Sequence, residues 1–386
     1  MCCKIQRCEK KNFCSCSADC GKIVHKEKKH SRAVGLSSAA SFLHEGASDG
    51  KRRFDSMFEI GKIPPQILER IVLDPVTHSK VHRDDIVVRP KTGEDCSAMD
   101  PKEELCVFST DPITGATKDT GYLAVHINCN DVFSAGAEPV GILMTVLLPP
   151  QSDEAMLEEL MHGTLKAAAE LGIEVLGGHT EVTDAVTKPV ISATVIGKTR
   201  NRKMVCTGGA EVGQDVIMTK WAGLEGTAII AHEHEDVLAQ RIDKELLEEA
   251  KDMKGYLSVG TESRIAMEHG ATAMHDATEG GILGAVWELA ECSGKGVQVF
   301  ADNIPIKEVT KAVCKEASIE PLLLISSGTM IISAFDGASL VEKLEAAGVE
   351  AAVIGRITES GKTILEQGEE RVLEQPKSDA LYQVKL

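Results

Sequence analysis

The chain has 386 residues, a length that suits two domains of ordinary size, each with its own core. Hydrophobic residues make up 43% of it and aromatic residues only 3%, which favours an α/β core of Ala, Val, Ile and Leu over an aromatic-rich β sandwich. Because no apolar run approaches the roughly 18 residues of a membrane span and no secretory h-region is visible, we expect no membrane partner and a cytoplasmic location.

The net charge of −17 is distributed unevenly along the chain. Residues 1–56 carry 12 Lys or Arg against 6 Asp or Glu, whereas the remainder carries 30 against 53. A body this acidic repels nucleic-acid phosphates, so we expect no nucleic-acid partner. The same body tolerates ATP only where metal ions screen the phosphates.

The first 56 residues also hold six of the twelve cysteines. Their spacing fits neither paired CxxC zinc knuckles nor ferredoxin runs. We interpret residues 1–56 as a Cys-rich, basic, disordered tail. Metal binding by the cysteines is one alternative, and a true start at Met57 is another.

Hydrophobic periodicity and caps predict an α+β domain over residues 57–206. A short helix follows Pro64 and Pro65, and the clearest helix spans residues 152–171, capped by Ser152 and stopped by Gly172. A further helix is predicted at 120–135, and strands at 86–88, 105–110, 140–148, 174–176 and 190–197.

A linker turn near residue 208 then leads into a second α/β unit over residues 207–386. Helices are predicted at 227–234, 244–250, 258–269, 281–292 and 338–347. Strands are predicted at 216–220, 273–275, 297–300, 329–334 and 352–357, followed by a strand and a loose tail after Gly368.

The segment from residue 109 to residue 139 carries two acids in a suggestive pattern. Asp111 ends a predicted strand, and Asp131 lies on the following helix beside Asn130. Acids at a strand end and on a facing helix can meet in a cleft, and Mg²⁺ bridges carboxylates to nucleotide phosphates. The pattern therefore predicts an ATP–Mg²⁺ site. Other nucleotide signatures are absent from the sequence, namely the P-loop, the strand–GxGxxG–helix and the kinase HRD and DFG motifs.

Five segments in a fixed order resemble the aminoimidazole ribonucleotide (AIR) synthase superfamily: STD…TGYLAVHINCNDVFSAGAEP, GGHTEVT, HDATEGGILGAVWELA, SSGTMIISA and IGRIT. The resemblance covers about residues 57–375. It is strongest toward the HypE hydrogenase-maturation proteins and the AIR synthase-related proteins. The group also includes thiamine-monophosphate kinase and selenophosphate synthetase.

The resemblance implies a two-domain PurM-like architecture of α+β and α/β class, with an N-terminal ATP-binding domain and a C-terminal α/β domain. It also implies a homodimer formed through the N-terminal sheets. The family's Gly-Asp-Asp-Ala loop corresponds to Gly93-Glu94-Asp95-Cys96 here. Glu94 and Asp95 would then join Asp111 and Asp131 as metal ligands, with Asn130 on the nucleotide.

The segment Gly177-Gly178-His179-Thr180 follows a predicted strand, and its glycines would let the backbone approach a ligand closely. Gly177, Gly178 and Thr180 are therefore candidate cofactor contacts. Many relatives carry an acid at the position of His179. His179 is a candidate phosphate ligand, metal ligand or general base, and the alternative is a loop histidine bonded to the backbone.

The segment from His275 to Gly281 joins a strand to a helix whose first N–H groups can bind an anion. Asp276 is a candidate catalytic residue, and Thr278, Gly280 and Gly281 are candidate ligand contacts; a structural cap is the alternative. Glu279 stands where HypE carries Arg, so a positive charge is missing from this loop.

We therefore expect an ATP- and Mg²⁺-dependent, HypE-like enzyme that activates a substrate oxygen, in hydrogenase or other metalloenzyme maturation. The substrate would be a small molecule or a carbamoyl-type group, and a maturation protein a partner. One alternative is a small-molecule kinase of the thiamine-phosphate type. Another is a nucleotide-binding maturation partner without catalysis, because the last cysteine is Cys314 and the carrier cysteine at the HypE C-terminus has no counterpart.

Overall fold

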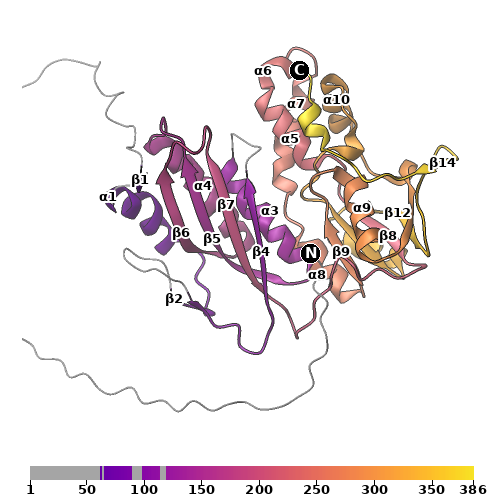
Figure 1. Cartoon of the computed structure of the whole chain (residues 1–386), viewed down its shortest axis with the longest axis horizontal. Helices are drawn as coiled ribbons and strands as arrows, with labels where there is room; N and C mark the ends of the chain where they lie inside the picture. The colour runs from indigo at the N-terminus through magenta and orange to yellow at the C-terminus, as the bar shows by residue number, and fades with distance from the viewer. Residues whose placement is uncertain (1–60, 63–64, 89–97, 114–118) are drawn as a thin grey trace, which may run out of the picture. The chain divides into compact units, whose positions relative to one another are not determined.

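The computed structural model describes residues 61–62, 65–88, 98–113 and 119–386, all within one compact unit that runs from Lys51 to Leu386 (Figure 1). The predicted tail and the Glu94–Asp95 pair lie outside the described residues. None of the helices in the described part of the chain combines the length and the apolar character that a membrane crossing requires.

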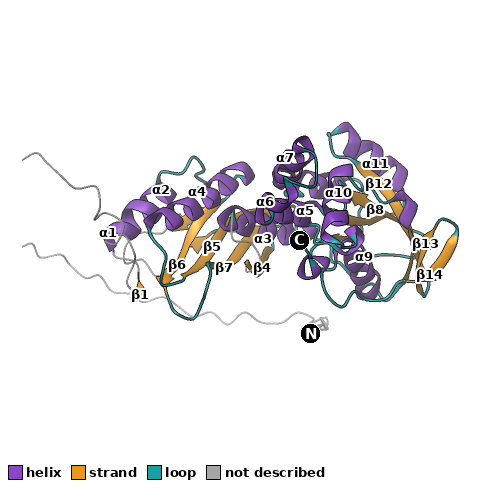
Figure 2. Ribbon diagram, turned by 90° about the horizontal axis from the view of Figure 1, so that it is seen from above, coloured by secondary structure: helices purple, strands orange, loops and turns teal. Residues whose placement is uncertain are grey.

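The first half is a five-stranded mixed sheet with two long helices on one face, as Figure 2 shows. The sheet order is β1-β6-β5-β7-β4, with β5 and β6 parallel and the other pairs antiparallel. The strands are β1 (Gly61–Lys62), β4 (Cys106–Ile113), β5 (Glu138–Leu148), β6 (Glu174–Val182) and β7 (Val190–Lys198), and the helices are α3 (Thr120–Ser134) and α4 (Glu154–Leu171).

Short elements complete this half. A helical run consists of α1 (Pro65–Leu68), a π-helical turn (Glu69–Leu73) and α2 (Asp74–Thr77), and β2 (Ile86–Val88) pairs with β3 (Ala98–Met99). Pro65 opens α1, as the sequence predicts, because the first turn of a helix needs no N–H from that residue.

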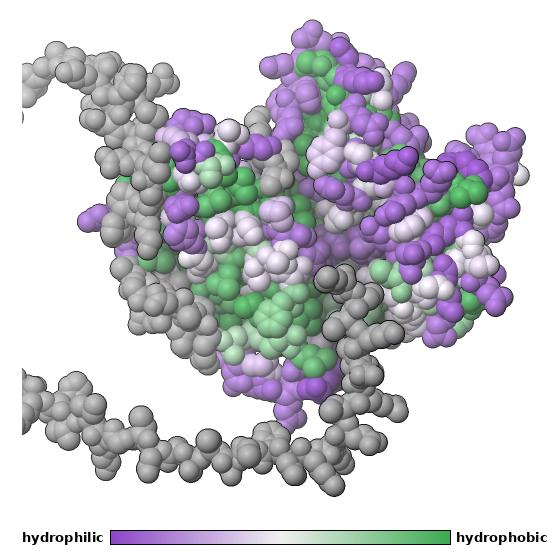
Figure 3. All heavy atoms as spheres, viewed as in Figure 1, coloured by the Kyte–Doolittle hydropathy of each residue, from purple (hydrophilic) through white to green (hydrophobic). Residues whose placement is uncertain are grey.

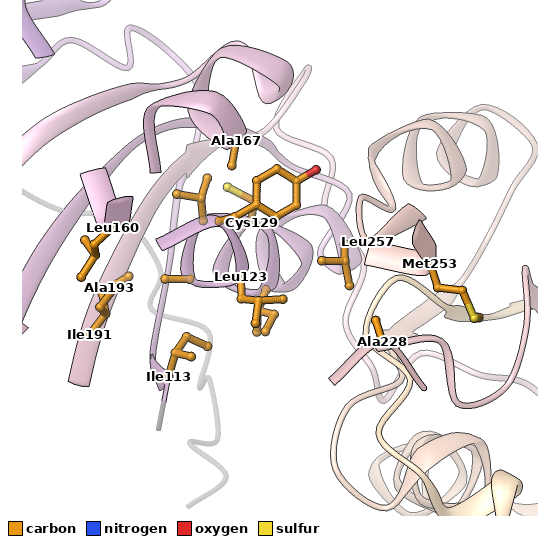
Figure 4. Packing of buried hydrophobic residues seen from close by; sticks show 14 of the residues in the cluster. Ile113, Leu123, Cys129, Leu160, Ala167, Ile191, Ala193, Ala228, Met253 and Leu257 are labelled. Carbon is orange, nitrogen blue, oxygen red and sulfur yellow. The ribbon is translucent and has the colours of Figure 1, made fainter. Parts of the chain in front are cut away.

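α3 is buried on almost every side, since it packs against α4 as well as β4, β5 and β7. Figure 4 shows Leu123 and Cys129 of α3 among the residues of the main hydrophobic cluster, which also includes Ile191 and Ala193 of β7. Gly121 permits the approach of α4, because a Cβ there would lie 2.2 Å from the Leu160 carbonyl oxygen. A helix enclosed in this way gives its polar residues fixed positions.

Three details of this half differ from the sequence prediction. Asp153 caps α4 in place of Ser152, and its carboxylate accepts a 3.0 Å hydrogen bond from the Met156 N–H. The other end of α4 agrees with the prediction, because Gly172 ends the helix in the left-handed conformation. The other two differences concern strand length. β4 continues two residues past Asp111, and β6 continues through the Gly-Gly-His-Thr segment, because both strands pair with long neighbours.

The second half is a seven-stranded sheet in the order β14-β13-β10-β12-β8-β11-β9. Its strands are β8 (Asp215–Thr219), β9 (Ala273–Asp276), β10 (Gly296–Phe300), β11 (Met330–Ala334), β12 (Ala351–Thr358), β13 (Lys362–Glu366) and β14 (Glu369–Val372). Its main helices are α5 (Leu224–Glu233), α6 (Glu235–Leu238), α7 (Lys244–Asp252), α8 (Gly260–Glu268), α9 (Gly281–Cys292), α10 (Glu308–Ala317) and α11 (Gly337–Ala346).

Alternate residues of these strands face two separate cores. Ile217, Met274 and Ile332 pack on one face with α8 and α11, whereas Val216 and Ile331 pack on the other with α9. α5, α7 and α10 pack on one another. The sequence prediction missed α10 and β13.

Candidate active site

Two carboxylates of the first half meet between α3 and β4. Ser109 and Asp111 are two residues apart on β4, so their side chains point to the same face. The Ser109 hydroxyl donates a hydrogen bond to Asp131 Oδ2 on α3, which shows that this face is turned toward the helix. The Asp111 and Asp131 side chains are also within hydrogen-bonding reach of each other.

A third carboxylate, Asp276, comes from the end of β9 in the second half. α3 contacts β9 directly. Asp276 is only 3% exposed, and its Oδ2 has no hydrogen-bond partner among the described residues. Its neighbour His275 bonds Glu288 of α9 through Nε2 at 2.9 Å. Residues 165 positions apart therefore converge on one acidic cluster.

The crowding of acids has a clear electrostatic effect. Burial, followed by the charge of Asp276, raises the pKa of Asp131 to about 7, although the Ser109 hydrogen bond opposes the change. Burial also raises the pKa of Asp276, assisted by the charges of Asp111 and Glu288. The cluster resists full ionisation on its own and is stabilised by added positive charge.

Two buried asparagines position α3 relative to this cluster. The Asn128 amide oxygen accepts the Asp111 N–H at 2.7 Å, so α3 holds the backbone beside the acid. Asn130 is directed elsewhere: its amide donates to the Leu257 carbonyl at 2.8 Å and accepts from the Val259 N–H at 3.2 Å. These contacts favour a structural role for Asn130, whose predicted part in cofactor binding stays a prediction.

The cluster has the chemistry of a magnesium site shared with phosphate. Mg²⁺ typically takes one or two protein carboxylates and completes its shell with water and phosphate oxygens. Asp111, Asp131 and the unpartnered oxygen of Asp276 fit that need. No three His, Cys, Asp or Glu side chains of the described residues are arranged to hold a metal ion by themselves, and Glu94 and Asp95 are not among those residues.

The Gly177–Thr180 segment is not brought to this cluster. β6 lies three strands from β4, about 14 Å at the usual strand spacing. His179 lies on the exposed face of the sheet, opposite to α3, where its Nε2 bonds Glu181 at 3.1 Å. A Cβ at Gly178 would lie 1.8 Å from the Met144 carbonyl oxygen, so this glycine allows close strand pairing.

The loop after β9 places its predicted residues at the start of α9, but not as an open anion site. Gly280 and Gly281 have positive φ, and the Gly281 N–H bonds the Thr278 carbonyl at 3.0 Å. The Gly280 N–H donates to Asp379 Oδ2 at 2.7 Å. The expectation that this N–H is available to a substrate anion is therefore wrong, because a carboxylate of the chain already occupies it.

Glu225 lies beside Ser327 in the same region: the 326–329 segment was predicted to close the substrate site, whereas Glu225 was not predicted as a site residue. Glu225 is on the first turn of α5, is 3% exposed, and accepts a hydrogen bond from the Ser327 N–H. The Ser327 hydroxyl and N–H are both close enough to the Glu225 carboxylate to oppose a rise in its pKa. Burial raises the pKa of Glu225 to about 7, with a contribution from the charge of Asp379. The buried acid in an otherwise apolar helix was the available sequence signal.

A cavity of about 450 Å³ lies at the other end of α3, some eleven residues or about 16 Å from Asp131. Thr120, Gly121, Lys166 and Lys254 are among its lining residues. None of the predicted site residues lines it. The cavity and the acidic cluster are therefore separate features along the same helix.

Two family profiles match most of the chain. The N-terminal domain of AIR synthase related proteins matches residues 93–199, and the C-terminal domain of the same proteins matches residues 211–367. The chain belongs to the AIR synthase related family. Its two halves thus carry the two domains of that family in the expected order.

Similar proteins of known name include two from the hydrogenase-maturation group. A putative hydrogenase expression/formation protein of Methanocaldococcus jannaschii is 24% identical over 84% of this chain and 97% of its own length. The carbamoyl dehydratase HypE of Cupriavidus necator is 26% identical over 70% of this chain and 79% of its own length.

Solved structures of similar fold agree with this placement. HypE in complex with ATP has a TM-score of 0.67 at 20% identity, covering 82% of this chain and 95% of its own. A HypE–HypF complex has a TM-score of 0.60 at 21% identity and covers 70% of this chain and 90% of its own. Thiamine-monophosphate kinase of Stenotrophomonas maltophilia has a TM-score of 0.64 at 21% identity and covers 78% of this chain and 97% of its own. These likenesses confirm the mixed α/β, two-domain PurM-like fold.

Proposed function

We propose that this family member is an ATP- and Mg²⁺-dependent enzyme of the HypE type, which uses ATP to activate an oxygen atom of a small-molecule or carbamoyl-type substrate. The observation that carries the proposal is the convergence of Asp111 and Asp131 with Asp276 from the other half of the chain. A relative named carbamoyl dehydratase and a neighbour solved with ATP support the same reaction class. A HypF-like maturation protein is the proposed partner, by analogy with the HypE–HypF complex.

Each residue would have a separate task. Bound Mg²⁺ would neutralise charge on the triphosphate while the γ-phosphoryl group moves. Asp111 and Asp131 would hold it, and Ser109 would fix the orientation of the Asp131 carboxylate. Asp276, in the second half, would face the substrate and accept a proton from its nucleophilic oxygen. Asn128 would keep the Asp111 backbone in place.

The test is the rate of phosphate release from ATP with Mg²⁺ in the purified protein. Asp131→Asn should lower this rate by at least about 10³-fold, because the phosphoryl transfer loses its charge neutralisation. Asp153→Asn is the matched control, since Asp153 caps α4 and has no part in the cluster. If the Asp131→Asn protein releases phosphate as fast as the Asp153→Asn control, the assignment of Asp131 is wrong.

A thiamine-phosphate-type kinase is the second candidate, supported by the fold likeness to thiamine-monophosphate kinase. The two candidates leave different products. A kinase leaves a phosphorylated metabolite, whereas a synthetase or dehydratase releases inorganic phosphate. A ³¹P NMR spectrum of the reaction mixture separates them in one experiment. ATP binding without turnover in the presence of substrate and partner would favour the third candidate, a non-catalytic maturation partner.

We also propose that two copies pair through the exposed face of the first-half sheet. Phe108 points away from α3 because its neighbour Ser109 points toward it, and Phe108 is 62% exposed. Figure 3 shows hydrophobic residues gathered over these strands. Phe108→Glu should convert a dimer into a monomer in light scattering, whereas Phe335→Glu, at an equally exposed Phe, should not. If light scattering gives the wild-type protein the mass of a single chain, the proposed pairing is wrong.

A further inference from the structure

A buried cation, Lys220, lies directly after the end of β8. Its side chain is 9% exposed, and its Nζ donates to the carbonyl oxygens of Tyr256, Ser258 and Gly328 at 2.8, 2.6 and 2.7 Å. Those three carbonyls match the three hydrogens of the ammonium group. Glu262 Oε1 of α8 lies 2.6 Å from the same nitrogen, and its charge balances the cation. The ammonium therefore joins the end of β8 to two distant segments of the second half.

The backbone at Lys220 is held in an uncommon conformation. Its φ of 53° is in the left-handed region, which a residue with a long side chain rarely adopts. Its N–H donates to the Glu350 carbonyl at 2.7 Å, so the turn is fixed from outside. A strained residue persists only where its surroundings determine it. Glycine or asparagine would suit this turn better, but neither could supply the ammonium.

The 256–259 segment is bound from its other side by α3. Asn130, next to Asp131, donates to the Leu257 carbonyl at 2.8 Å and accepts from the Val259 N–H at 3.2 Å. The carbonyls at 256 and 258 bond the ammonium and the carbonyl at 257 bonds α3, so the polar groups alternate between the two partners. Leu257 also belongs to the main hydrophobic cluster, as Figure 4 shows. The segment thus connects the ammonium to the helix that carries Asp131.

The third carbonyl leads to the acid of the second half. Gly328 lies against the same segment, because a Cβ there would be 2.8 Å from the Tyr256 carbonyl oxygen. The next residue, Thr329, accepts the Ala277 N–H at 2.9 Å, and Ala277 follows Asp276. A hydrogen bond to Gly328, the next peptide unit and a second hydrogen bond therefore connect the ammonium to the backbone beside Asp276.

We propose that Lys220 is a positioning residue: by binding the carbonyls of two segments at once, its ammonium sets where Asp276 lies relative to Asp131. The proposal rests on the proposed function, because that reaction needs the acids of both halves at one site. Lys220 acts through the backbone, since its nitrogen contacts carbonyls and Glu262. A reacting constellation is held in place by such supporting hydrogen bonds, and small displacements of it are costly.

Two variants test the geometry and the charge separately. Lys220→Arg keeps the charge opposite Glu262 but places a longer, planar head among the three carbonyls. Lys220→Met combined with Glu262→Gln removes both charges and keeps the volumes similar. In each full-length protein, kcat for phosphate release from Mg²⁺–ATP should fall by about 10- to 100-fold, because a displacement of about 1 Å costs that much. The KM for ATP should change by less than about twofold, since Asp111 and Asp131 remain together on the first half.

Ile364→Ala is the matched control for lost stability. Ile364 is fully buried in β13, five strands from β9 in the sheet, so its truncation leaves a cavity far from the acids. Both kcat and KM of this variant should stay within about twofold of wild type. A loss of kcat in the Lys220 variants alone would then reflect position and not general instability.

A second measurement needs no nucleotide. Hydrogen exchange is followed at the Val259 N–H, which bonds Asn130, and at the Ala277 N–H, which lies beside Asp276. In both Lys220 variants the two amides should exchange at least about tenfold faster relative to the amides of α4, because both depend on the same ammonium. In Ile364→Ala the two amides should keep their wild-type rates relative to α4.

Two results would overturn the proposal. One is a folded Lys220 variant with the kcat of wild type, and the other is faster exchange at only one of the two amides. If one variant does not fold, the other carries both measurements. A wild-type protein that does not hydrolyse ATP would contradict the proposed function, and the exchange rates would still decide whether Lys220 connects the two acids.

Discussion

The raised pKa of Asp131 makes a prediction about stability that is independent of turnover. Its ordinary pKa is 3.8, and burial with the charges of Asp276 and Asp111 raises it to about 7 in the folded chain. A carboxyl whose folded pKa exceeds its unfolded pKa contributes stability below the unfolded value and loses it as pH rises through the folded value. Wild type without metal should therefore lose stability between pH about 4 and pH about 7. Asp131→Asn removes that loss.

The magnitude follows from the same two values. A difference of about 3 in pKa corresponds to about 4 kcal/mol, which is the largest gain the variant can show above pH 8. The Ser109 hydroxyl bonds a neutral amide instead of a carboxylate in the variant, which costs about 1 kcal/mol. The variant should therefore be about 1 kcal/mol less stable than wild type at pH 4 and about 3 kcal/mol more stable at pH 8, a change of about 4 kcal/mol in the difference.

Urea denaturation of both proteins at pH 5, 6, 7 and 8 with EDTA measures this difference. Addition of Mg²⁺ at pH 8 should then stabilise wild type and leave the variant nearly unchanged, because Mg²⁺ supplies the positive charge that the cluster lacks. A difference that stays constant from pH 5 to pH 8 would show that Asp131 ionises without penalty. The account of a crowded acidic cluster would then be refuted.

Three further variants test other parts of the structure. The stability of Glu225→Gln relative to wild type should increase by about 3 kcal/mol between pH 5 and pH 8, because burial raises the pKa of this acid from 4.5 to about 7. Urea denaturation at the two pH values measures this change. Asn130→Ala should lower the free energy of unfolding by about 2–4 kcal/mol, because it breaks two buried hydrogen bonds, one to the Leu257 carbonyl and one from the Val259 N–H. The KM for ATP should not change. Gly121→Ala should cost about 1–3 kcal/mol in a thermal melt, because its Cβ meets a backbone carbonyl of α4 at 2.2 Å.

The sequence predicted those parts of the fold that depend on local pattern. α3, α4 and β5 have long hydrophobic periods and clear end signals, and each lies within a few residues of its predicted range. β6 was predicted three residues long and has nine, because its glycines are strand residues only in the presence of β5. α10 was missed, since its stripe gains meaning only from its packing on α5 and α7. Such errors arise where tertiary contacts decide the structure.

The candidate site shows the same division. Asp111 and Asp131 were predicted to meet from their spacing around one strand and one helix, and the structure places them together. The Gly177–Thr180 segment was grouped with them on resemblance, yet strand order places it three strands away. Asp379 was not predicted at all, because it is 99 residues from the Gly280 N–H that it caps. Contacts of this kind depend on how the chain returns to the cleft, which no local pattern encodes.

The acids that the two halves contribute to the cluster need an added positive charge. Asp131 accepts a hydrogen bond from Ser109, whereas Asp276 Oδ2 has no hydrogen-bond partner among the described residues. Because burial and neighbouring carboxylates raise the pKa of both Asp131 and Asp276, a divalent cation carrying a triphosphate would balance their charges. A cation held by acids from both halves would fix the triphosphate relative to Asp276, and this arrangement would bring the reacting groups together in a defined orientation.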